Sequence, residues 1–122
     1  MGLMLVVLLL VSCNKDPGAG AILKHIVGHY TATEICFQYA VYDTTYNVPL
    51  TITSADEILA VVGIDTMVYR GYNDNTDTYN FMDQYGGPNT TNYVLEVDPK
   101  FHYIIFYTQS GPSYSCNYYV TI

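Results

Sequence analysis

The sequence predicts an all-β protein, an antiparallel up-and-down meander of about eight short strands that forms a small barrel or a sandwich. Apolar residues recur with a period of two along almost the whole chain, and clusters of turn-forming residues separate the alternating runs at short intervals. The chain also contains fourteen tyrosines and no tryptophan. Tyrosine rings suit this fold because an aromatic side chain packs well on a pleated surface.

The alternation is clear in residues 47–53, where Val48, Leu50 and Ile52 share one face of the expected strand. Polar clusters such as 43–47 and 72–77 are expected to be turns between strands. Only residues 21–27 have a pattern that allows a short helix. In chain order, the expected strands are 28–42, 47–53, 58–62, 66–72, 78–82, 92–97, 102–109 and 114–122.

An apolar run of nine residues, from Leu3 to Val11, opens the chain. It is too short to cross a bilayer as a helix, which takes about 20 residues, but it has the length of the apolar core of a secretory signal. The run ends in Leu10-Val11-Ser12-Cys13, which resembles the bacterial lipobox. The resemblance implies that residues 1–12 are a signal peptide and that the thiol of Cys13 carries diacylglycerol.

The rest of the chain divides into a tether and one domain. Residues 14–20 are polar and rich in Gly and Pro, so we expect residues 13–27 to be a lipidated N-terminus and tether. Residues 28–122 are expected to form a single β-barrel-like domain, because the mature chain has room for one modest core. Asn14 favours delivery to the outer membrane, and Lys15-Asp16 partly resembles the signal that sends lipoproteins to the cell surface.

The charge of the chain limits its partners. Four Lys and Arg residues stand against eleven Asp and Glu residues, which gives a net charge of −7. A chain with so few cations has no basic stripe that could neutralise phosphates. We therefore expect no binding to nucleic acid and no electrostatic attachment to anionic lipid.

The motifs of common active and metal sites are incomplete in this chain. His25 and His29 have the spacing of one helical face, but the Glu of a His-Glu-x-x-His zinc site is missing. Residues 73–77 begin like a calcium loop, yet Thr78 stands where that loop needs Gly and Gln84 where it needs Glu. We expect no enzymatic activity, no metal site and no cofactor.

The tyrosines allow two interpretations. In the first, they simply cover the strands as amphipathic packing residues. In the second, the outward rings of Tyr42, Tyr119 and one of Tyr103 or Tyr107 form a platform on which sugars or peptide side chains stack. Tyr42, Tyr103, Tyr107 and Tyr119 are therefore the candidate ligand-facing aromatics.

The lipobox, the short tether, the Gly28-His29-Tyr30 opening and the tyrosine-rich meander together resemble the small uncharacterised lipoproteins of Bacteroidota-type Gram-negative bacteria. The resemblance implies a location in the cell envelope and a β-barrel-like domain. It also implies O-glycosylation at Asp-Thr sequences that are followed by a small or apolar residue. Thr44 and Thr66 fit that pattern, and both are expected in turns.

Two classes of function remain open. An anchored binding module would capture a small ligand, a glycan or a protein through a cavity or a flat cluster of exposed rings. A structural accessory subunit of an outer-membrane or surface assembly would instead present an exposed apolar edge strand and little pocket. The sequence slightly favours the binding module.

Cys36 and Cys116 remain after Cys13 is lipidated, and an oxidising envelope favours a disulfide between them. The topology agrees, because a closed meander pairs the first strand with the last. The alternation disagrees. Cys116 belongs to the inward-facing residues of its strand, whereas Cys36 is expected on the outward face, because the inward residues of its strand are expected to be Ile35, Phe37, Tyr39 and Val41. This assignment places a bulge near Thr33. Side chains on opposite faces cannot be bridged, so we predict two free thiols, with Cys116 in the core.

Overall fold

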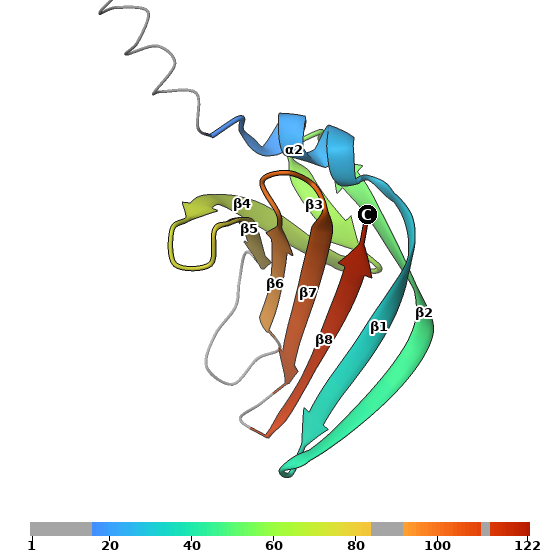
Figure 1. Cartoon of the computed structure of the whole chain (residues 1–122). Helices are drawn as coiled ribbons and strands as arrows, with labels where there is room; N and C mark the ends of the chain where they lie inside the picture. The colour runs from blue at the N-terminus through green and yellow to red at the C-terminus, as the bar shows by residue number, and fades with distance from the viewer. Residues whose placement is uncertain (1–15, 84–91, 111–112) are drawn as a thin grey trace, which may run out of the picture.

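The computed structural model describes residues 16–83, 92–110 and 113–122, which form one short helix and eight antiparallel strands (Figure 1). Each strand pairs with its neighbours along the sequence, and the last strand pairs with the first, so the meander closes into a barrel. This confirms the predicted fold class and selects the barrel over the sandwich. The elements are α2 (Ala19–Ile26), β1 (Gly28–Gln38), β2 (Val41–Ala55), β3 (Leu59–Val62), β4 (Asp65–Asn73), β5 (Thr78–Asp83), β6 (Asn92–Val97), β7 (Tyr103–Ser110) and β8 (Tyr114–Thr121).

The first hairpin turns earlier than the sequence predicts. Tyr39 and Ala40 form a two-residue loop in which φ is 48° and 64°, the left-handed conformation that suits the twist of a hairpin. The expected turn at 43–47 is instead part of β2. The sequence misled here because the polar residues of 43–47 resemble a turn, whereas Tyr-Ala carries no turn signal.

A β-bulge interrupts the pairing of β1 with β2. Ala32 lies opposite Val48 and Glu34 opposite Thr45, so two residues of β2, Tyr46 and Asn47, face the single Thr33 of β1. Asn47 takes a φ of 60°. The bulge therefore lies beside Thr33, the position that the sequence predicts. However, the extra residue belongs to β2, and the alternation of β1 continues without a break.

This placement of the bulge reverses the expected faces of β1. Glu34 and Cys36 continue the inward phase of the buried Ala32, so Ile35 and Phe37 face outward and their predicted inward placement is wrong. Tyr39 lies in the turn, and Val41 begins β2 on the same face as Cys36. Cys36 lies directly opposite Cys116 in the pairing of β1 with β8, and a disulfide joins them with a Cα–Cα distance of 4.0 Å. The prediction of two free thiols is wrong, and the placement of Cys116 in the core is confirmed.

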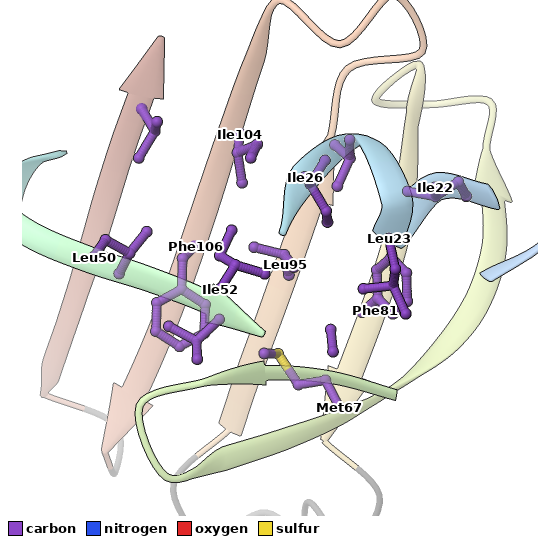
Figure 2. Close-up of a cluster of buried hydrophobic side chains, with 14 of the residues drawn as sticks. Ile22, Leu23, Ile26, Leu50, Ile52, Met67, Phe81, Leu95, Ile104 and Phe106 are labelled. Atoms are coloured by element: carbon purple, nitrogen blue, oxygen red, sulfur yellow. The ribbon is translucent and has the colours of Figure 1, made fainter. Parts of the chain in front are cut away.

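The helix α2 lies across one end of the barrel (Figure 1). Its apolar residues Ile22, Leu23 and Ile26 follow helical spacing and are buried in the same core as the strands. Figure 2 shows Leu23 directed towards Phe81 of β5. The folded unit therefore starts before residue 28, where we expected it to begin, and includes part of the expected tether.

The end of the barrel beneath α2 is filled with side chains (Figure 2). Met67, Phe81, Leu95 and Ile104 are at or near zero exposure, and they come from four different strands. This part of the barrel is a packed core rather than a ligand chamber. Among the described residues, no helix has the length and apolar character needed to cross a membrane.

Candidate functional site

A cluster of aromatic side chains covers the outer surface of β7 and β8. Ile104 and Phe106 point into the core, so the alternation of β7 places Tyr103, Ile105 and Tyr107 on the outside. Register sets their neighbours: Ile105 lies between Glu96 of β6 and Tyr119 of β8, and Tyr107 lies opposite Asn117. We call this surface the tyrosine face, and it consists of Glu96, Tyr103, Ile105, Tyr107, Asn117 and Tyr119.

The side chains of the tyrosine face differ in their exposure to solvent. Tyr103 and Tyr119 are 37% and 38% exposed, and Tyr107 and Ile105 are half-buried. Tyr119 lies directly across from Ile105 and diagonally from Tyr107, the positions at which side chains on one sheet face touch. The result is an apolar surface of rings around a central aliphatic side chain.

Glu96 gives this surface a fixed polar group. The hydroxyl of Tyr107 donates a hydrogen bond to the Glu96 carboxylate. Burial raises the pKa of Tyr107 to about 12, and the nearby charge of Glu96 adds to the shift. Burial also raises the pKa of Glu96, an effect that the hydrogen bond from Tyr107 partly offsets.

The phenol of Tyr103 is also held in the neutral form. Burial raises the pKa of Tyr103, and the charges of Asp98, Asp77 and Glu96 raise it further. The side-chain amide of Asn117 donates to the hydroxyl of Tyr119 over 3.4 Å. The face contains no Lys or Arg, so it offers neutral rings, hydroxyl groups, an amide and a single carboxylate. Such a surface can stack against the apolar side of a sugar ring or a peptide side chain and hydrogen-bond to its edge.

Three of the four predicted aromatics come together on this face, and Tyr42 does not. Tyr42 is 72% exposed near the end of the β1–β2 hairpin, where its ring packs on Phe37 with a centroid distance of 4.9 Å. Phe37 is four residues along β1 from Thr33, which pairs with Tyr119. The expectation that Tyr42 shares a platform with Tyr119 is therefore wrong.

The predicted modification sites have different outcomes. Thr44 and Thr66 are both exposed, but each lies within a strand, β2 and β4 respectively, and not in a turn as expected. Cys13 lies outside the described residues.

The incomplete metal motifs adopt other structures. His25 stacks on Phe101 from α2, with ring centroids 4.2 Å apart, whereas His29 lies on β1 with its Nδ1 3.0 Å from Thr51 Oγ1. The helix ends at Ile26, so the two imidazoles do not share a helical face.

The start of the apparent calcium loop is a polar turn. The side-chain oxygen of Asn73 accepts the N–H of Asn75, and the carboxylate of Asp77 accepts the hydroxyl of Tyr72. Its twelfth position, Gln84, lies outside the described residues.

A groove that the sequence does not predict lies at the hairpin end of the barrel. It has a volume of about 460 Å³ and is lined by Glu34, Cys36, Gln38, Val41, Tyr42, Asp43 and Tyr114. Glu34 also accepts a hydrogen bond from Tyr118. Glu34, Cys36 and Cys116 bring three potential metal ligands together, but the disulfide occupies both sulfur atoms and leaves one carboxylate. Once the bulge is assigned to β2, the same alternation that pairs the cysteines also predicts an inward Glu34.

Comparison with known proteins gives no match to a protein family, a curated protein or a solved structure.

Proposed function

We propose that the protein is an envelope-anchored lipoprotein that binds a glycan or a protein ligand through the tyrosine face. The observation that carries this proposal is the grouping of Tyr103, Tyr107 and Tyr119 around Ile105 on one outer surface. Side chains on the outside of a soluble barrel are usually polar and contact water. A group of half-exposed rings around an aliphatic residue therefore favours contact with a ligand.

The anchor in this proposal is Cys13. The lipobox-like sequence Leu10-Val11-Ser12-Cys13 supports acylation of its thiol, and the chain then resembles the small lipoproteins of Bacteroidota-type bacteria. Attachment to the outer membrane would hold the barrel in the periplasm or at the cell surface. Thr44 and Thr66, both exposed, are the proposed acceptors for O-glycosylation.

The packed core supports an outer rather than an inner site. Phe81, Leu95 and Ile104 occupy the barrel axis beneath α2, where a barrel that carries a small ligand would need space (Figure 2). A ligand as wide as a sugar chain or a protein loop can instead lie flat across β7 and β8.

One observation favours the second class of function, a structural accessory subunit. The end of the β1–β2 hairpin exposes Tyr39, Val41, Tyr42 and Tyr46, a set of apolar side chains that a larger assembly could cover. A ligand captured by the hairpin rather than by the tyrosine face would support this alternative.

Binding to a glycan array and to envelope proteins tests the proposal, with the chain from residue 13 onward carrying Cys13→Ala as the soluble form. Tyr107→Ala and Tyr119→Ala should each weaken binding about fivefold, because stacking on a ring contributes on the order of 1 kcal/mol. Tyr46→Ala, which removes an exposed ring outside the face, is the matched control. Unchanged binding in both tyrosine-face variants would contradict the proposal, and loss in Tyr46→Ala alone would support the hairpin instead.

A further inference from the structure

The hairpin half of β2 has a neighbour on one edge only. The strand pairs with β1 along most of its length, but β3 pairs only with residues Ile52–Ala55. Among the residues that the structure describes, 41–51 therefore have no partner on the side away from β1. A barrel normally removes such edges, so this opening is a departure from the closed architecture.

The turn determines which backbone groups lie on the open edge. A two-residue hairpin loop makes Gln38 and Val41 a hydrogen-bonded pair, and every second pair after them repeats that pattern. The N–H and C=O groups of Tyr42 and Thr44 consequently point away from β1. The bond from the N–H of Tyr39 to the carbonyl of Ser113, 3.4 Å long, agrees with this alternation because it directs the odd residues of β1 towards β8.

Protection against strand pairing is present on only part of this edge. Natural edge strands are blocked by bulges, prolines and charged side chains, above all lysine. The bulge at Asn47 and Pro49 block the stretch nearer to β3 in this way. Residues 41–45 contain no bulge and no proline. Their one charged side chain, Asp43, lines the groove instead of shielding the edge.

The charge around the open edge indicates the partner. A strand added beside residues 41–45 would direct every second side chain towards the groove that contains Asp43 and Glu34. No Lys or Arg occurs in β1, β2, β7 or β8, so these carboxylates have no cation from the surrounding strands. A second copy of the chain fits poorly, because its net charge of −7 and a second Asp43 would repel.

We propose that the Val41–Thr45 edge of β2 binds an extended segment of another protein by strand addition, and that this segment carries Lys or Arg at alternate positions facing Asp43 and Glu34. Main-chain hydrogen bonds to Tyr42 and Thr44 supply the attachment, and the acidic groove supplies the selectivity. The inference does not depend on ligand binding at the tyrosine face.

Fluorescence anisotropy with two labelled eight-residue peptides tests this inference. One alternates Lys with Val and Thr, and the other has Glu in place of each Lys. We expect the Lys peptide to bind at least tenfold more tightly, and Asp43→Asn to reduce that preference. Thr44→Pro removes the outward N–H without removing a hydrogen bond to β1. This variant should therefore bind the Lys peptide at least tenfold more weakly than the parent does. The matched control Thr44→Val keeps the N–H and should bind as the parent does.

Four results would overturn the inference. Equal affinity for the two peptides, or no binding of the Lys peptide at millimolar concentration, would remove the assigned partner. Equal binding by Thr44→Pro, with circular dichroism and the thermal midpoint unchanged, would mean simple charge attraction without strand addition. A dimer in sedimentation that Thr44→Pro abolishes would assign the edge to a second copy of the chain. Tyr119→Ala should bind both peptides as the parent does, which separates this test from that of the tyrosine face.

Discussion

Cys36 and Cys116 join the first strand of the barrel to the last across 80 positions of sequence. A bridge that closes so long a loop restricts the unfolded chain strongly and contributes about 4 kcal/mol in the chain-entropy description. We predict that the double variant Cys36→Ser, Cys116→Ser loses stability of this order in urea denaturation.

Reductant provides the control for the disulfide. The parent protein in reductant should match the double variant, and the variant itself should not respond. Alkylation of the denatured, unreduced protein should leave Cys36 and Cys116 unmodified, so modification of both would contradict the bridge.

Glu96 gives the stability of the barrel a dependence on pH. Its raised pKa means that the folded protein holds this proton more tightly than the unfolded chain does. The resulting stability is present at low pH and is lost as the pH rises through the pKa of the folded form. We therefore predict that Glu96→Gln stabilises the protein more at pH 7.5 than at pH 4, both relative to the parent, in urea denaturation at the two pH values. An equal effect at both pH values would contradict a raised pKa.

At the scale of single elements, α2 belongs to the barrel as a structural part. Leu23 is 2% exposed and directed towards Phe81 (Figure 2). Leu23→Ala should lower the free energy of unfolding by about 2–5 kcal/mol, the usual cost of a large-to-small change in a core. The exposed neighbour Lys24→Ala should change it by less than about 0.5 kcal/mol. Similar small effects in both variants would mean that α2 does not contribute to the core.

The elements also show how far sequence patterns reach in this protein. Most strands were predictable, because alternation in β2 near Leu50, in β6 and in β8 follows the faces of the barrel. The hairpin at Tyr39–Ala40 was not, since neither residue signals a left-handed turn. The bulge shows a second limit: the sequence of β1 indicated an irregularity at the correct height, but only the pairing partner reveals which strand contains the extra residue.

The same limit explains which parts of the candidate site were predictable. Tyr103, Tyr107 and Tyr119 were identifiable as outward rings from the alternation of their own strands. Their neighbours Glu96 and Asn117 depend on the register between strands, which a single sequence does not specify. The groove at Glu34 depends on the bulge and was missed for the reason that the disulfide was missed.

At the scale of the whole molecule, attachment to the membrane depends in this account on one thiol. Cys13→Ala should move the protein from the detergent phase to the aqueous phase in a phase-partitioning experiment on cells that express the full chain. Asn14→Ala, next to the proposed acylation site, should partition as the parent does. Retention of the Cys13→Ala variant in the detergent phase would contradict lipid anchoring.

Ligand binding on the outer surface of β7 and β8 is the central claim, and tyrosine ring resonances test it most directly because the chain has no tryptophan and fourteen tyrosines. The measurement is a nuclear magnetic resonance titration of the ring-labelled protein with the ligand that binds best in the array or envelope screen. The account predicts that the ring signals of Tyr103, Tyr107 and Tyr119 shift with one common dissociation constant while the buried Tyr79 stays unchanged. Shifts confined to Tyr39, Tyr42 and Tyr46 would place the ligand on the hairpin and contradict the claim.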